Sequence, residues 1–203
     1  MRDEIPRATP RPDAPDATAA LGPYLTSDNE VLRCAATRAL ASATAADPHV
    51  KQRLEALLLD PDPDVRSDAM AAFATLAGPE DAPTLRRSLE GDPVREVKLA
   101  AMEVLARLRD AGSVDLMRAL VLSRAEDRVA WEDAGGDWDD WLDIQIAAID
   151  ALGRMGVQDA IENMLAARDD EFGQTLDMPV FNALARMGNE GAIWLLAVTQ
   201  TET

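Results

Sequence analysis

The sequence predicts an all-α protein, a right-handed α-solenoid of about five helical hairpins followed by a terminal helix. Three observations support this fold class. The chain of 203 residues is 47% hydrophobic but only 4% aromatic, so its apolar content is mostly Ala, Leu, Val and Met, which suit helices better than strands. A short apolar pattern recurs along the chain. A turn rich in Asp, Pro or Gly precedes each copy of that pattern.

Each copy begins with a polar or basic residue and continues with apolar residues three, seven and ten positions later. These steps place the apolar side chains on one face of a helix, so each copy predicts a buried helix face. The copies begin at Arg33, Arg66, Lys98, Gln145 and Asp177, at intervals of 33, 32, 47 and 32 residues. Their apolar positions are Ala36, Leu40, Ala43; Ala69, Phe73, Leu76; Ala101, Leu105, Leu108; Ala148, Leu152, Met155; and Val180, Leu184, Met187.

A second amphipathic segment precedes the turns, which makes the repeating unit a helix–turn–helix hairpin. These segments lie at residues 54–59, 82–89, 114–122 and 160–167, and residues 190–199 predict the terminal helix. Asp62, Asp92 and Asp137 are predicted N-caps, with Pro63 and Pro93 at the first helical position.

The predicted boundaries follow from composition. Residues 1–17 are expected to form a disordered tail, because four prolines fall within residues 6–15. Residues 18–198 form the predicted repeat domain, and residues 199–203 a C-terminal tail. The N-terminus has no apolar core of a signal peptide, and no run of about 18 apolar residues occurs, so we expect a cytoplasmic protein.

Two stretches resemble a known family. The runs "DPDPDVRSDAMAAFATLAG" and "DPVREVKLAAMEVLARL" are similar to HEAT-like repeats of the short bacterial kind, named for their occurrence in phycobilin lyase subunits. The resemblance covers about residues 18–198. The family usually has Arg after the turn, whereas Gln145 and Asp177 stand at the last two copies. This departure indicates either that these repeats stack differently or that they belong to a distinct subfamily.

The charge and the rare residue types limit the chemistry. With 37 acidic and 20 basic residues the net charge is −17, so we expect neither nucleic acid nor a membrane surface as a partner. A single Cys and a single His cannot form a Cys/His zinc site or a supported catalytic pair, and no EF-hand loop or catalytic motif occurs. We therefore expect no catalytic residue, no metal site and no bound cofactor, and the Ala, Arg and Asp bias indicates a bacterial source.

One candidate binding surface is a row of basic residues on the second helices. Arg107, Arg154 and Arg186 stand two positions after the second apolar residue in three successive copies. The family resemblance implies that second helices line the concave side, so these residues would form a basic ladder for an acidic partner. The alternative is that Glu103 with Arg107, and Asp150 with Arg154, pair along their own helices at i, i+4 spacing.

The other candidate surface is an insertion. The 47-residue interval exceeds the others by about 15 residues, which places an insertion at about residues 123–138 and includes "WEDAGGDWDDW". Trp141 falls on the buried face of the following helix, and Trp138 lies near its edge. Trp131, Glu132 and Asp133 form an aromatic and acidic loop without an evident structural role, so together with Trp138 they are predicted to bind a partner.

These observations predict a non-catalytic protein-interaction scaffold, an adaptor or an accessory factor in the assembly of a larger enzyme. Phycobilin lyases attach a tetrapyrrole to a partner protein, so the resemblance implies an alternative: a lyase-like or chaperone-like factor that helps attach or insert a cofactor. The expected partner is another protein, and the chain is expected to be monomeric. Trp194 in the terminal helix either caps the array or marks a dimerisation surface.

Overall fold

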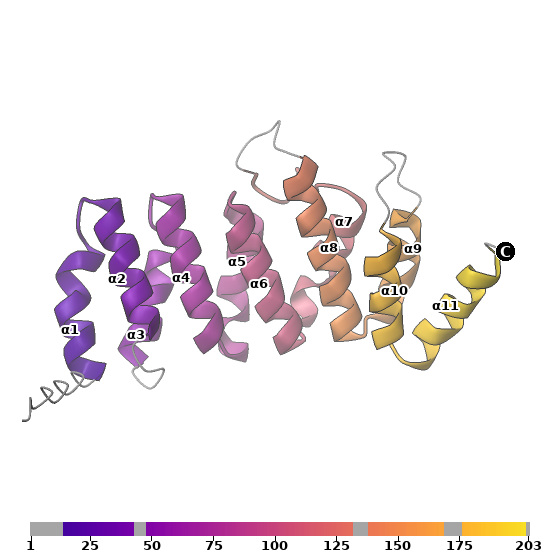
Figure 1. The fold of residues 1–203 in the computed structure, drawn as a ribbon, viewed down its shortest axis with the longest axis horizontal. Coiled ribbons are helices and arrows are strands. Elements are labelled where there is room, and N and C mark those ends of the chain that lie inside the picture. Colours follow the sequence, from indigo (N-terminus) through magenta and orange to yellow (C-terminus); the bar gives the residue numbers. More distant parts are fainter. Residues whose placement is uncertain (1–13, 43–47, 132–137, 169–175, 202–203) are drawn as a thin grey trace, which may run out of the picture. The chain divides into compact units, whose positions relative to one another are not determined.

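The fold is all-α. A computed structural model describes residues 14–42, 48–131, 138–168 and 176–201 (Figure 1). These residues form eleven α-helices and three short 3-10 helices, with no strand among them. The chain divides into two compact units, Met1–Leu76 and Ala77–Thr203. Each hairpin of a repeat array contacts only its neighbours, so such a chain can divide where a hairpin ends.

The first unit contains four helices. They are α1 (Ala14–Leu25), α2 (Glu30–Ser42), α3 (Pro48–Leu57) and α4 (Pro63–Leu76). Helix α2 packs against α1 and α4, and α3 packs against α4. Because α1 begins at Ala14, residues 14–17 are helical although they fall in the predicted tail; residues 1–13 lie outside the described part.

The second unit contains three hairpins and a terminal helix. The hairpins are α5 (Ala82–Gly91) with α6 (Arg95–Leu108), α7 (Val114–Leu122) with α8 (Trp138–Met155), and α9 (Ile161–Ala167) with α10 (Asp177–Arg186). Helices α6, α8 and α10 pack on one another in succession, and α7 packs on α9 (Figure 1). The terminal helix α11 (Asn189–Thr201) packs against α10. Short 3-10 helices lead into α5, α7 and α9: η1 (Pro79–Asp81), η2 (Ala111–Ser113) and η3 (Gln158–Ala160).

The predicted helical register is confirmed. In every copy of the pattern, the residues three and seven positions after its start are buried. Small residues also allow close helix contacts: a Cβ atom on Gly153 of α8 would lie 2.7 Å from Cα of Ala183 in α10. The buried pattern residues are Ala36, Leu40, Ala69, Phe73, Ala101, Leu105, Ala148, Leu152, Val180 and Leu184.

The predicted helix caps are correct at one turn and wrong at another. Asp62 Oδ1 accepts the backbone N–H groups of Asp64 and Val65 at 3.0 and 3.1 Å, and α4 begins at Pro63, as predicted. Asp92 Oδ1 instead accepts the N–H of Val94 at 3.0 Å, and α6 begins only at Arg95. The Asp92 carboxylate therefore closes a turn ahead of the helix, and Asp137 lies outside the described residues.

In the first three copies of the pattern, the basic residue after the turn donates a hydrogen bond from its helix to a backbone carbonyl of that turn. Arg33 Nη1 donates a hydrogen bond to Ser27 O at 2.8 Å, and Arg66 Nη1 donates to Asp60 O at 2.9 Å. The equivalent lysine, Lys98, donates through Nζ to Asp92 O. In all three cases the acceptor lies six residues earlier, so the long cationic side chain satisfies a carbonyl that the turn leaves without a helical partner.

The last two copies make different contacts at this position. Gln145 Nε2 reaches across the insertion and donates to Val121 O at 2.7 Å, near the end of α7. At the fifth copy the polarity is reversed, because Asp177 Oδ1 accepts a hydrogen bond from Arg168 Nε at 2.6 Å. The departure from a basic residue at Gln145 and Asp177 thus accompanies a change of partner, while a hydrogen bond is kept at both.

Candidate functional site

The first part of the insertion is packed onto the preceding hairpin. The Ala125 N–H bonds to Ser123 Oγ at 3.2 Å, and Ala125 has a left-handed φ of 46°, which is costly for a residue other than glycine. The side chains of Ala125 and Val129 are buried. The Ala130 N–H donates to Glu90 O at 2.7 Å, near the end of α5. The insertion therefore covers the turn between α5 and α6.

Trp131 has a structural role, contrary to the interpretation from sequence. Its indole Nε1 donates to Arg124 O at 2.9 Å, and the Arg124 guanidinium carbon lies 4.7 Å from the ring centroid. Lys98 Nζ lies 5.5 Å from the same ring, within cation–π range. The side chain is half-buried, so only part of it is open to a partner. Glu132 and Asp133 lie outside the described residues, as does the side chain of Trp138.

Lys98 is completely buried beneath this insertion. Its ammonium group donates to Leu89 O at 3.2 Å and to Asp92 O, and faces the Trp131 ring. Burial lowers the pKa of Lys98 to about 8, an effect that the charge of Asp92 partly opposes. An amine with this pKa has the chemistry of a nucleophile, but a nucleophile has to meet its substrate. Because Lys98 has no exposed surface, its role here is structural: it holds the turn between α5 and α6 through hydrogen bonds to Leu89 O and Asp92 O.

The three predicted arginines do not form a purely basic ladder. Arg154 on α8 pairs with Glu103 on α6, and its hydrogen bond to that carboxylate raises the pKa of Arg154. Arg186 on α10 pairs with Asp150 on α8. Arg107 donates through Nη2 to Ala77 O at 3.1 Å. Acids and bases thus alternate across three helices.

The alternative within-helix pairing is observed between Asp150 and Arg154. Arg154 Nη1 lies 3.6 Å from Asp150 Oδ2, as the i, i+4 spacing predicts. The other acid, Glu103, is paired with Arg154 of the next hairpin. Sequence spacing could not reveal this pairing, because it depends on how α6 and α8 pack. A carboxylate from a partner would have to compete with the protein's own acids for Arg154 and Arg186.

We expect the pairing between Arg186 and Asp150 to stabilise the protein only slightly. Both side chains are substantially exposed, so a double-mutant cycle with Arg186→Ala and Asp150→Ala should give a coupling free energy of about 0.2–1 kcal/mol. Urea unfolding of the four proteins measures it. Zero coupling would mean that the pairing gives no net stabilisation, and a value near 3 kcal/mol would mean that solvent does not screen it.

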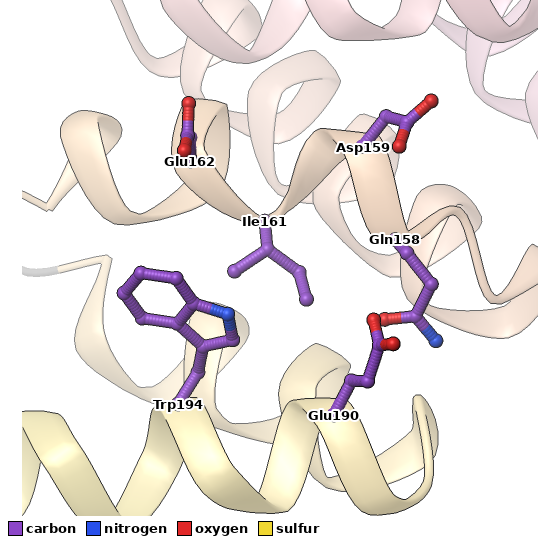
Figure 2. A pocket seen from close by; sticks show the side chains of 6 residues that line it. All are labelled: Gln158, Asp159, Ile161, Glu162, Glu190 and Trp194. Atoms are coloured by element: carbon purple, nitrogen blue, oxygen red, sulfur yellow. The ribbon is translucent and has the colours of Figure 1, made fainter.

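A groove lies between α11 on one side and η3 with the start of α9 on the other. Its volume is about 350 Å³, and Figure 2 shows Ile161 and Trp194 projecting into the gap from opposite sides. Gln158 Nε2 donates to Met187 O at 3.2 Å, which ties η3 to the residue just after α10. The lining residues are Gln158, Asp159, Ile161, Glu162, Glu190 and Trp194. The sequence did not predict this groove; its one signal was Trp194 in an otherwise aliphatic terminal helix.

Helix α11 leaves large apolar side chains exposed. A Cβ atom on Gly191 would lie only 1.9 Å from Leu184 O, so α11 contacts α10 through a glycine that is itself buried. Ile193, Trp194 and Leu196 are 66%, 41% and 61% exposed. Trp194 therefore does not close the array as a buried cap would.

The described residues contain no group of three or more His, Cys, Asp or Glu side chains placed to hold a metal ion. Cys34 is buried, and burial raises the pKa of its thiol. Among the described helices, none has the length and apolarity needed to cross a membrane.

Comparison with known proteins confirms the resemblance and the solenoid fold. The family model for HEAT repeats matches residues 51–134. A chain from the complex of CpcE and CpcF of phycocyanin lyase from Nostoc sp. PCC7120 is similar in fold, with 19% identity and a TM-score of 0.61, over 93% of this chain and 70% of that one. An engineered protein from the Northeast Structural Genomics Consortium is 19% identical with a TM-score of 0.50, over 93% and 90% of the two chains. No curated protein matches the sequence significantly.

Proposed function

We propose that the protein is a non-catalytic protein-binding scaffold that works as an adaptor or as an accessory factor in the assembly of a larger enzyme. The observation that supports this best is the exposed apolar surface formed by Ile193, Trp194 and Leu196 on α11. Apolar side chains that gather on one helix, beside polar groups, are typical of interaction sites. Tryptophan is also enriched among the residues that contribute most to binding.

The type of fold supports the same proposal. HEAT repeats stack into arrays that present long surfaces to other macromolecules. The phycocyanin lyase chain of similar fold comes from a complex of two proteins, CpcE and CpcF. By analogy, this chain would act together with another protein.

The two surfaces predicted from the sequence, the insertion and the row of arginines, would make secondary contacts with the partner. Part of the Trp131 side chain remains accessible, and the insertion continues through Glu132 and Asp133 to Trp138. Arg107 lies in the last turn of α6, and Arg154 and Arg186 belong to the row of alternating acids and bases on α6, α8 and α10. These groups would orient a partner that α11 anchors.

Affinity capture with the full chain tests the proposal. We expect wild-type protein to retain one partner in stoichiometric amount from lysate of its source cells, and Leu196→Asp to lose it, because an aspartate in a desolvated interface costs several kcal/mol. Leu59→Asp is the matched control, since Leu59 is 86% exposed and lies in the other unit. Equal capture by both variants, or no specific partner at all, would contradict the proposal.

The second candidate function is a lyase-like or chaperone-like role in attaching or inserting a cofactor into a partner. The similarity to a chain of the phycocyanin lyase complex favours this alternative. It requires that the protein, alone or with its partner, bind the cofactor. Titration with a free linear tetrapyrrole, followed by absorbance and by tryptophan fluorescence, distinguishes the two: saturable binding favours the cofactor role, and unchanged spectra favour the scaffold.

A further inference from the structure

We infer that the groove between α9 and α11 seats an amphipathic helix with basic side chains that belongs to a partner protein. This inference rests on the proposed scaffold function and specifies the chemistry of its partner. It follows from three features of the groove: an apolar strip with helical spacing, a surrounding set of carboxylates, and the lack of a cation among its lining residues.

The apolar strip has the geometry of a helix-packing surface. Glu190, Ile193, Trp194 and Ala197 are exposed and stand at i, i+3, i+4 and i+7, so they share one face of α11. Ile161 projects toward Trp194 from the opposite side of the groove (Figure 2). Ile193 on this face is 66% exposed, and Trp194 beside it is 41% exposed. Helices pack by fitting side chains into such rows, so a second helix fits this face.

The charges around the strip select a basic occupant. Asp159 and Glu162 lie on the side of η3 and α9, and Glu190 lies on α11 (Figure 2). None of the six lining residues is Lys or Arg. These carboxylates are not grouped closely enough to hold a metal ion. Separated carboxylates beside an exposed indole instead suit the long, flexible side chains of Lys and Arg, whose cations also interact with an aromatic face.

A second copy of this chain fits the groove less well. The only charged residue within Asn189–Thr201 is Glu190, so pairing two α11 helices would bring carboxylates together without a compensating cation. The whole chain carries a net charge of −17, which adds repulsion between copies. Charge complementarity therefore favours a basic partner segment over self-association.

Binding of a synthetic helical peptide tests the inference. The probe is a fluorescein-labelled peptide of about 16 residues with leucines at i, i+3, i+4 and i+7 and lysines beside them. A second peptide replaces the lysines with glutamates, and a third has the same composition in scrambled order. Fluorescence anisotropy with the full chain should show saturable binding of the basic amphipathic peptide that weakens with salt, and at least about tenfold weaker binding of both controls.

Substitutions in the protein locate the binding site. Glu162→Lys combined with Glu190→Lys should weaken binding of the basic peptide at least about tenfold, and Trp194→Ala should weaken it as well. Asp115→Lys on the exposed surface of α7 changes the charge at a residue outside the groove and should leave the affinity unchanged. Circular dichroism of each variant checks that the helices are retained.

Three outcomes would overturn the inference. Equal binding of the basic, acidic and scrambled peptides would show that the groove selects neither positive charge nor an amphipathic helix. A concentration-dependent dimer in sedimentation equilibrium, abolished by Trp194→Ala, would show that a second copy covers the groove. A captured partner that Leu196→Asp loses but the Glu162→Lys, Glu190→Lys variant retains would refute the basic helix while leaving the scaffold function intact.

Discussion

Replacing Ala101 with glutamate is expected to unfold the hairpins around α6. Ala101 has no exposed surface and lies within α6, which packs against α5 and α8. The larger side chain would have to displace neighbouring atoms and would bury a carboxylate. Lys98, one turn earlier on α6, already donates its hydrogen bonds to Leu89 O and Asp92 O. An uncompensated buried charge costs about 3–5 kcal/mol, a large part of the roughly 5–15 kcal/mol by which a domain is stable. Circular dichroism and urea unfolding should show a lost or greatly shifted transition.

Ala71→Glu is the matched control for this variant. Ala71 of α4 is exposed, and it has the same place in its copy of the pattern that Glu103 has in α6. Glutamate is therefore already accepted at this position of the repeat, and we expect a change in unfolding free energy of no more than about 0.5 kcal/mol. If Ala101→Glu remains soluble and unfolds cooperatively at the wild-type urea concentration, the register of the array is wrong.

The helical register was predictable from the sequence because periodic burial leaves a periodic pattern. A residue such as Leu105 or Leu152 contacts its neighbours from a fixed face of its helix, and only apolar residues are stable there. The same reasoning placed Trp141 correctly in the core. Each of these predictions concerns a side chain relative to its own helix, which local spacing determines.

Contacts between distant residues were not predictable in this way. Trp131 covers Lys98, which is 33 residues earlier in the sequence, and no periodic pattern connects the two positions. The sequence located the insertion by its extra length but not the surface on which it folds. Trp131 therefore looked like a residue without a structural role.

The groove was missed for a related reason. It arises because Gly191 lets α11 approach α10, which leaves Trp194 opposite Ile161 of another helix. Composition indicated an aliphatic terminal helix with one tryptophan, but it did not indicate which face would remain uncovered. Surface features of this kind depend on how helices pack rather than on which residues form them.

The stability that Lys98 contributes is expected to rise with pH. The pKa of Lys98 is lowered from 10.5 to about 8 in the folded protein, mainly because burial disfavours the charged form. Between these two values the unfolded chain holds the proton more strongly than the folded chain does, so the free energy of unfolding increases with pH. The full contribution is present above pH 10.5 and is lost as the pH falls through about 8, with a total change of roughly 3 kcal/mol.

Comparing wild-type protein with Lys98→Met isolates this contribution. Methionine fills a similar volume without a charge, but it leaves Leu89 O and Asp92 O without the donor that Lys98 provides. A neutral lysine amine still donates to these carbonyls, so the advantage of the wild type over the variant should be smallest near pH 7. It should grow between pH 8 and 10.5, as measured by urea unfolding at each pH.

Arg66→Met supplies the control that separates the proton from the hydrogen bond. Arg66 donates to Asp60 O as Lys98 donates to Asp92 O, six residues earlier in both cases, but a guanidinium stays charged throughout this pH range. The difference between wild type and Arg66→Met should therefore be independent of pH between 8 and 10.5. The difference in unfolding free energy between wild type and Lys98→Met could also prove independent of pH. Lys98 would then have the same pKa in the folded and unfolded chains, and the insertion that carries Trp131 would not exclude water from it.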